Sequence, residues 1–456
     1  MKNVVLFLLF ILCAVFSINN AYAQKPAFPG AEGFGKFTQG GRGGKVLIVD
    51  KISDQLQNPE TGTLRWAVNK DGPRVIIFAV SGTIALEAPL KIKQGHITIA
   101  GQTAPGDGIC LKNFVVNIEA DQVIIRYLRF RCGIERAISD SQDGINGKKH
   151  SDIILDHCSV SWSIDEAASF YDNKNFTMQW CIVSESLYNA GHSKEGHGYG
   201  GIWGGMGASF HHNLLASNTS RNPRFCGARY HGNESAHELV DVRNNVIFNW
   251  GFNTMYGGEG GWQNIVGNYF KSGPATRKHK DRILNPDGSN SRWFVNDNFV
   301  EGFPEISADN WRGGVQDADT IFSVIRSEKE FPFAGLPGES AQEAYEKVLR
   351  CAGANFPKRD LIDARIVEEV KSGVCKFGDT WGSGTGIIDS QQSVGGWPFL
   401  KTYNQLPDTD KDGMPDVWEK KHKLNPKDPT DGAVDTDENG VNNFEEYLNS
   451  LGTSNQ

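Results

Sequence analysis

The sequence predicts an all-β fold, a parallel β-helix, followed by a small α-helical module that binds calcium. Three observations predict it. Short β-rich runs recur from about residue 95 to residue 300, separated by Gly, Asn, Asp and Ser. The 52 glycines among 456 residues fit a chain with many turns, and the stretch of runs shows no convincing long helix. Two acidic loop motifs follow after residue 405.

Residues 1–23 have the pattern of a secretory signal peptide. Lys2 gives a positive start, the apolar run VVLFLLFILCAVF follows, and the small residues AYA at 21–23 provide a cleavage site. No later segment approaches the ~18 apolar residues that span a bilayer. We therefore expect a soluble, secreted protein, located in the periplasm or outside the cell.

Seven of the β-rich runs share one shape, in which apolar residues flank a single pivot position. The pivots are separated by 30, 23, 32, 32, 23 and 30 residues. A minimum near 23 with insertions is typical of a parallel β-helix, whose coils have a fixed strand core and variable loops. The pivot residues are Leu128, Cys158, Cys181, Asn213, Asn245, Asn268 and Asn298.

Asparagine suits such a column because its amide can bond to the neighbours above and below. An antiparallel sandwich would also have short strands, but hairpin signals are scarce and one pivot through seven runs favours the β-helix. On this interpretation Cys158 and Cys181 are stacked core residues. His211 and His212 stand just before a pivot and are interpreted as scaffold rather than as metal ligands.

The β-helix domain is expected to span residues 24–395, with additional elements in 300–395. Residues 338–354 and 361–373 have the pattern of helices or mixed elements, and the nearby Cys351 and Cys375 could form a disulfide. Residues 396–407 have the Gly and Pro content of a linker. The calcium module is expected at 408–451.

Residues 408–419, DTDKDGMPDVWE, match the calcium-loop pattern D-x-D-x-D-G-x5-E at every position. In that pattern Gly413 permits the sharp turn and the main-chain carbonyl of Met414 is one ligand. The expected side-chain ligands are Asp408, Asp410, Asp412, Asp416 (through water) and Glu419.

Residues 435–446, DTDENGVNNFEE, repeat this pattern with Gly440 at the turn. A helix-like segment follows each loop, so the two loops predict a paired, EF-hand-like module with a structural role. A plain acidic tail would explain the charge but neither the glycines nor the terminal glutamates. The expected ligands are Asp435, Asp437, Asn439, the Val441 carbonyl, Asn443 and Glu446.

Several functions are disfavoured by composition. The formal net charge of −8 argues against a nucleic-acid binder. The seven cysteines after the signal peptide contain no C-x-x-C pair, so a thiolate zinc site is disfavoured. No G-x-S-x-G motif supports a serine hydrolase.

Carboxylates are frequent between residues 140 and 172. Asp152 and Asp156 lie four residues apart at the start of one expected strand, and Asp143 precedes them by a short turn. Carboxylates on neighbouring coils would suit a hard cation such as calcium. An ordinary acidic turn explains the same spacing equally well.

Five segments occur in order from about residue 27 to residue 300: AFPGAEGFGKFTQGGRGGKV, GTLRWAVNKDGPRVIIFAVSGTI, ITIAGQTAPG, DGINGKKHSDIILDHCSVSWS and HHNLLASNTSRNPR. Together they resemble the pectate lyases of polysaccharide lyase family 1. The resemblance implies a right-handed parallel β-helix. It also implies calcium-dependent β-elimination of polygalacturonate, the demethylated form of pectin, to unsaturated oligogalacturonates.

The resemblance also implies site residues. Asp156 in ILDH resembles a calcium ligand of the family, and Asp152 and Asp143 resemble its partners. Arg221 in RNPR matches the catalytic arginine, which the family uses as the base.

Substrate-binding roles are implied for two further cations. Lys194 resembles a substrate-binding lysine. Cys226 stands where the family often has another arginine, and Arg224 or Arg229 could replace it.

The chemistry explains why an arginine would act as base. Elimination removes the proton α to a uronate carboxylate, and bound calcium offsets the charge that develops. Arg221 would accept that proton, helped by the cation and by Arg224 and Lys194. An arginine more often pairs a substrate carboxylate, and the resemblance favours the base.

Two rival functions stay open on the sequence alone. A polygalacturonase-type hydrolase needs paired carboxylates, for which Asp165, Glu166 and Asp172 are available. A non-catalytic β-helix that binds polysaccharide would not need Arg221. The sequence favours a monomeric lyase with Ca²⁺ as cofactor and a pectic polysaccharide as its partner.

Overall fold

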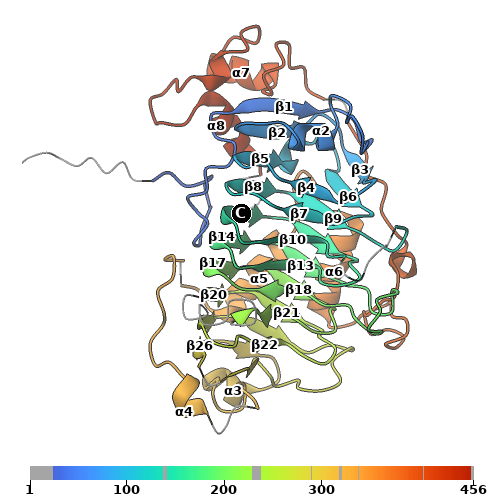
Figure 1. The fold of residues 1–456 in the computed structure, drawn as a ribbon, viewed down its shortest axis with the longest axis vertical. Coiled ribbons are helices and arrows are strands. Elements are labelled where there is room, and N and C mark those ends of the chain that lie inside the picture. Colours follow the sequence, from blue (N-terminus) through green and yellow to red (C-terminus); the bar gives the residue numbers. More distant parts are fainter. Residues whose placement is uncertain are drawn as a thin grey trace, which may run out of the picture.

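The strands of the chain form three parallel sheets that run along one long axis (Figure 1). The computed structural model describes residues 24–452 except 137–139, 141, 228–237, 289, 318–320, 337 and 404. Each complete coil contributes one strand to each sheet, so the architecture is a parallel β-helix, as the repeated runs predict. The expected signal peptide at 1–23 lies outside the described residues.

Within each sheet the strands follow one another in chain order along the axis. Sheet A contains β1 (Lys45–Val49), β2 (Arg74–Phe78), β5 (Ile97–Ala100), β8 (Val123–Arg126), β11 (Ser151–Asp156), β14 (Lys174–Gln179), β17 (Met206–His211), β20 (Leu239–Arg243), β23 (Trp262–Val266) and β26 (Arg292–Asn296). Sheet B contains β3 (Gly82–Ala85), β6 (Ile109–Lys112), β9 (Leu128–Arg131), β12 (Ser159–Ser161), β15 (Ile182–Ser184), β18 (Leu214–Ala216), β21 (Val246–Phe248), β24 (Tyr269–Lys271) and β27 (Phe299–Val300). Sheet C contains β4 (Leu90–Ile92), β7 (Val116–Ile118), β10 (Ile145–Lys148), β13 (Ala168–Tyr171), β16 (Ile202–Trp203), β19 (Arg224–Phe225), β22 (Met255–Gly257) and β25 (Leu284–Pro286).

The register of sheet A reproduces the pivot spacings. Val123 lies beside Ile153 and Ile153 beside Phe176, which are offsets of 30 and 23 residues. From β14 to β26 the offsets are 32, 32, 23 and 30. Equivalent residues of successive coils therefore stack directly on one another.

The pivot column is a ladder of buried asparagine amides. The backbone N–H of Asn213 donates to Oδ1 of Asn245 at 2.9 Å, and that of Asn245 donates to Oδ1 of Asn268 at 3.0 Å. The ladder continues through Asn298 to Asn310, which the pivot alignment did not include. Each turn between sheets A and B is thereby fixed by the neighbouring coil.

The core lies inside the coils, between the three sheets. Its central aromatic rings are fully buried, and rings of sheet C stack on rings of sheet A, with ring centroids 4.8 Å apart for Phe170 and Phe176 and 4.3 Å apart for Trp203 and Phe210. Stacked rings of this kind bury a large apolar area at every coil.

The helices lie outside the coils. They are α2 (Leu64–Val68), α3 (Pro304–Ala308), α4 (Phe322–Ile325), α5 (Ala341–Cys351), α6 (Leu361–Ser372), α7 (Asp416–His422) and α8 (Asn443–Ser450), with short 3₁₀ turns η1 (Gly101–Thr103), η4 (Gln391–Val394) and η5 (Asp431–Ala433). The two helices expected after the coils are confirmed as α5 and α6. Ser340 and Glu343 form a capping box at the start of α5, and Gly373 ends α6 at φ 70°.

The bridge suggested between Cys351 and Cys375 is wrong. The seven cysteines of the described residues are buried thiols, and no disulfide joins them. Cys375 lies instead beside the coils, with its Sγ 3.5 Å from Nδ2 of Asn249. Cys158 and Cys181 are fully buried in the core, as the repeat predicts.

The C-terminal segment returns to the first coils. Thr402, within the expected linker, donates to the carbonyl of Ser81 at 2.7 Å. α7 and α8 lie beside β1 (Figure 1), where Met414 and Phe444 pack in one cluster with Ile77. None of the helices in the described residues is long and apolar enough to cross a bilayer.

The asparagine ladder predicts a large stability effect at a single position. Asn245→Ala should lower the free energy of unfolding by about 3 kcal/mol, because the amides of Asn213 and Asn268 lose buried partners. Denaturant unfolding followed by circular dichroism measures it. The control is Asn296→Ala at an exposed side chain, expected to change stability by less than about 0.5 kcal/mol. Equal effects of the two variants would contradict the ladder's role.

Candidate active-site groove

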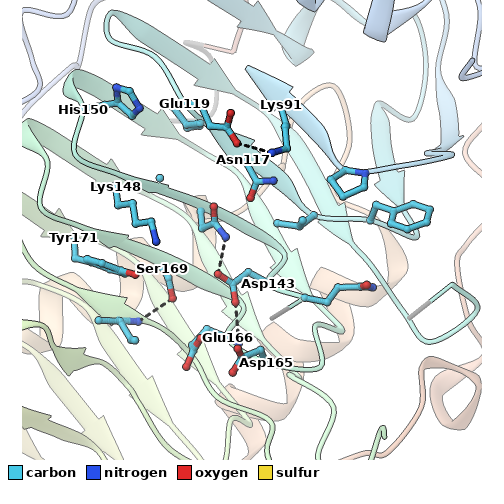
Figure 2. A pocket seen from close by; sticks show the side chains of 18 of the residues that line it. Lys91, Asn117, Glu119, Asp143, Lys148, His150, Asp165, Glu166, Ser169 and Tyr171 are labelled. Atoms are coloured by element: carbon cyan, nitrogen blue, oxygen red, sulfur yellow. Dashed lines mark hydrogen bonds and ion pairs between the residues drawn. The ribbon is translucent and has the colours of Figure 1, made fainter. Parts of the chain in front are cut away.

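A groove of about 750 Å³ runs across sheet C (Figure 2). Side chains of β7, β10 and β13 line it, among them Asn117, Lys148 and Tyr171. Figure 2 shows Asp143, Asp165 and Glu166 gathered at one end. Lys91, Glu119 and His150 lie at the other end of the same view.

The acidic end is built by the loops that precede strands of sheet C. Glu166 forms a parallel bridge with Tyr199, and Tyr199 forms another with Ser220. The N–H of Gly144 donates to the carbonyl of Glu166 at 3.2 Å. The residues before β10, β13, β16 and β19 therefore stack coil on coil, and Arg221 is carried to the groove beside them.

Three carboxylates meet at this end. Oxygens of Asp143, Asp165 and Glu166 all lie within 4.8 Å of one another. Asp143 accepts from Nδ2 of Asn146 at 2.8 Å and from the N–H of Glu166 at 3.3 Å. Burial, followed by the charge of Asp165, raises the pKa of Asp143 to about 8. A bound cation would offset the repulsion among these three carboxylates, and a set of carboxylate oxygens fits Ca²⁺.

Two histidines hold Asp165 from the outer side. Nε2 of His197 lies 2.7 Å from Oδ1 of Asp165. The ring of His192 stacks on that of His197 with centroids 3.8 Å apart. Lys194 lies between them in the chain, lines the groove, and donates its backbone N–H to Nδ1 of His192 at 3.0 Å.

Arg221 is held against the carboxylates by two contacts. Its guanidinium forms an ion pair with Glu166 and lies 4.6 Å from the centre of the Tyr199 ring. Its backbone is in the left-handed region at φ 55°. Gly200 makes this close packing possible, because a Cβ there would lie 2.4 Å from the carbonyl oxygen of Arg221.

Three residues expected in the site line the groove: Asp143, Lys194 and Arg221. The structure does not bring Asp152 and Asp156 to them. Both lie on β11 in sheet A, whereas the groove is formed by sheet C and its preceding loops. Two aspartates close in sequence to Asp143 are thus carried to another side of the coil.

Asp156 is fully buried and has partners of its own. Its carboxylate lies 2.8 Å from Nε of Arg126 and 2.8 Å from Nδ1 of His157, and it accepts from Gln179 at 2.7 Å. Although burial raises it, His157 and Arg126 hold the pKa of Asp156 below its ordinary value. This carboxylate is saturated by protein donors, which is the pattern of a structural ion pair.

Asp152 and Arg224 also have other partners. Asp152 accepts from Nδ2 of Asn175 at 3.0 Å. Arg224 lies on β19 and pairs with Glu259, with 2.6 Å between Nη2 and Oε1. Neither residue lines the groove.

Asp165 and Glu166 are the groove carboxylates that the sequence did not assign to the cation site. The coil spacing itself could have found them. The spacing of 23 residues that aligns the pivots Cys158 and Cys181 also aligns Asp143 with Glu166. Stacked positions are thus a better guide to this site than proximity in sequence.

In the first acidic loop of the C-terminal module, oxygens of Asp408, Asp410 and Asp412 lie within 4.8 Å of one another. Glu419 is fully buried on α7. Asp416 accepts the N–H and hydroxyl of Thr409 at 2.8 and 2.9 Å.

The second loop is more open. Asp435 accepts the N–H of Gly440 at 2.6 Å, as expected at the turn. Nδ2 of Asn439 donates to Asp437 at 3.0 Å and to Glu446 at 2.7 Å. Asn443 donates to the carbonyl of Asp431 and to the hydroxyl of Thr436, both at 2.8 Å. The first loop is therefore the better-formed cluster.

Comparison with known proteins shows the family to which the chain belongs. It is 32% identical over 448 residues to a probable pectate lyase C of Aspergillus fumigatus, covering 97% of each chain. The chain belongs to the pectate lyase family. A probable pectate lyase C of Aspergillus flavus is 33% identical over 433 residues, covering 93% of this chain and 94% of the relative. No family model matches the chain.

The fold has a solved counterpart. The major cedar pollen allergen Jun a 1 aligns with 71% of this chain and 92% of its own, at a TM-score of 0.52 and 19% identity. This likeness supports the parallel β-helix. Membership of the pectate lyase family makes the chain an enzyme of the polysaccharide lyase class.

The separate locations of Asp143 and Asp156 predict separable effects. Asp156→Ala should lower the free energy of unfolding by about 3 kcal/mol, because it leaves Arg126 buried without its partner. Its affinity for calcium in the groove should be unchanged. Asp143→Ala should weaken calcium binding and leave the stability of the calcium-free protein unchanged or raised, because a buried carboxylate is removed.

Denaturant unfolding and calorimetric calcium titration of both variants test this pair. If Asp156→Ala weakens calcium binding in the groove as strongly as Asp143→Ala does, Asp156 is a calcium ligand and its separate location does not matter for binding.

Proposed function

We propose that this protein is an exported pectate lyase that cleaves polygalacturonate by calcium-dependent β-elimination, with Arg221 as the base. The observation that carries the proposal is the placement of Arg221 beside the cluster of Asp143, Asp165 and Glu166 in the groove. The product would be an unsaturated oligogalacturonate. Export rests on the signal-peptide pattern of residues 1–23.

The groove suits a linear polyanion. Lys91, Lys148 and Lys194 line it, so ammonium groups occur along its length, and Lys91 is paired with Glu119 at 3.1 Å. A chain of uronates laid across sheet C would meet these groups one after another. Positive charge of this kind attracts and aligns an anionic polymer.

The groove carboxylates would hold the calcium ion. Asp143, Asp165 and Glu166 supply oxygen ligands, and Asp152 and Asp156 are not needed. When bound, the ion would neutralise a substrate carboxylate and stabilise the negative charge that develops next to it. Asp165 is oriented for this task by His197.

Arg221 would take the proton from the carbon α to the carboxylate. Tyr199 holds the plane of its guanidinium, and Glu166 connects it to the carboxylate cluster. Its placement beside the proposed calcium site supports its role as a proton acceptor in elimination.

The C-terminal module would bind calcium for stability rather than for catalysis. Its first loop gathers carboxylates, and its apolar side chains pack on the first coils. Neither of its loops contributes to the groove.

The proposed reaction predicts a calcium-dependent ultraviolet absorbance from the unsaturated product when the protein meets polygalacturonate. Arg221→Ala should lower kcat by roughly a thousandfold, because the proton acceptor is lost. Arg224→Ala, three residues further along at the start of β19 and paired with Glu259, is the matched control and should keep most activity. New reducing ends without the absorbance would indicate a hydrolase, and no cleavage of any pectic polymer would indicate a binding protein.

The Tyr199 contact predicts a positioning effect. Tyr199→Leu should lower kcat roughly tenfold with little change in KM, because the guanidinium of Arg221 loses the ring that orients it. Tyr199→Phe keeps the ring and should retain activity. Steady-state rates at saturating calcium measure both. A parallel loss in both variants, or a change in KM alone, would contradict the positioning role.

A further inference from the structure

The first acidic loop of the C-terminal module lies next to a carboxylate from outside its motif. Oxygens of Asp412, Glu419 and Asp431 all lie within 4.8 Å of one another. Asp431 begins η5, in the segment between the two loops, twelve residues beyond Glu419. The calcium-loop pattern has no position for it.

Buried oxygens without donors point into this cluster. Glu419 is 0% exposed, and neither of its carboxylate oxygens has a hydrogen-bond partner among the described residues. The same holds for one oxygen each of Asp410, Asp412 and Asp431. Buried polar groups are normally satisfied, so a group of carboxylate oxygens without donors suits a bound cation.

The number of oxygens is the second sign of a cation site. Both carboxylate oxygens of Glu419 and one oxygen each of Asp410, Asp412 and Asp431 are buried without a hydrogen-bond partner among the described residues. Hard oxygen ligands in this number fit Ca²⁺, which takes six to eight oxygens.

Asp431 is held in place for such a role. One of its oxygens accepts the N–H of Asn425 at 2.8 Å, and the other is the unpartnered one. Its carbonyl accepts from Asn443 at 2.8 Å. Gly432 lets the turn approach the loop, because a Cβ there would lie 2.9 Å from Oδ2 of Asp412.

We propose that Asp431 is a calcium ligand of the first loop, together with Asp410, Asp412 and Glu419. The inference rests on the proposed calcium-binding function of the module and adds a ligand that the motif does not contain. Asp416, the motif's water-mediated ligand, is engaged by Thr409.

The extra ligand gives the ion a role in holding the module together. It would tie α7, which carries Glu419, to η5, which carries Asp431. η5 packs against α8, and α8 packs Phe444 and Leu448 on the first coils. Calcium at this position would therefore strengthen the attachment of the module to the β-helix.

The test uses the whole chain after calcium removal, titrated with CaCl₂ in a calorimeter. Asp431→Asn should raise the Kd of one site by roughly tenfold or more, because a charged ligand is lost. Asp428→Asn is the matched control: this exposed residue of the same turn caps Thr430 and is absent from the cluster. Glu419→Gln should lose the same site.

A second measurement distinguishes the loss of a ligand from misfolding of the variant. Tb³⁺ luminescence sensitised by Trp418, which lies on α7 beside the loop, should fall in Asp431→Asn and not in Asp428→Asn, while circular dichroism stays unchanged. If Glu419→Gln loses a site and Asp431→Asn titrates like Asp428→Asn, Asp431 is not a ligand. If all three variants titrate like the parent chain, the proposal that the C-terminal module binds calcium fails.

Discussion

Register between neighbouring coils is the constraint on which the rest of this structure depends. Parallel strands share backbone hydrogen bonds with the coil above and the coil below, so a slip of one residue would turn every core side chain outward. The asparagine ladder centred on Asn245 prevents that slip, because each amide must meet the next one in a buried column. The same register also stacks Glu166, Tyr199 and Ser220, and thereby assembles the groove from loops far apart in sequence.

Within the groove, like charges are held closer than folding alone would favour. Asp143, Asp165 and Glu166 lie close together, and burial, followed by the charge of Asp165, raises the pKa of Asp143. A carboxylate cluster that lowers the stability of the protein without a cation can bind a cation strongly. Glu166 belongs both to this cluster and to the ion pair with Arg221, so a cation bound by the cluster would be electrostatically linked to the guanidinium. The ring of Tyr199, against which the guanidinium lies, holds Arg221 in this position.

The C-terminal module follows a different physical principle. Its helices are short and bury little apolar area, so side chains such as Met414 and Phe444 reach stability only by packing on the outer face of the first strands. Its carboxylates gather around a point rather than along a groove. Calcium bound to the module would strengthen its attachment to the β-helix, whereas calcium bound in the groove would take part in the proposed elimination.

The sequence by itself determined the parallel β-helix, because stacked coils impose a spacing that survives loop variation. It also predicted α5 and α6 from their helix-like pattern. A family resemblance singled out Arg221, which lines the groove, and its role as base stays a prediction. Only the tertiary structure decided which carboxylates share a site, because neighbours in sequence diverge onto different sheets at every coil. Asp156 was thus carried to a buried pair with Arg126, whereas Glu166 was stacked beside Asp143. Distance along the chain does not encode that choice, since it depends on which strand each residue precedes.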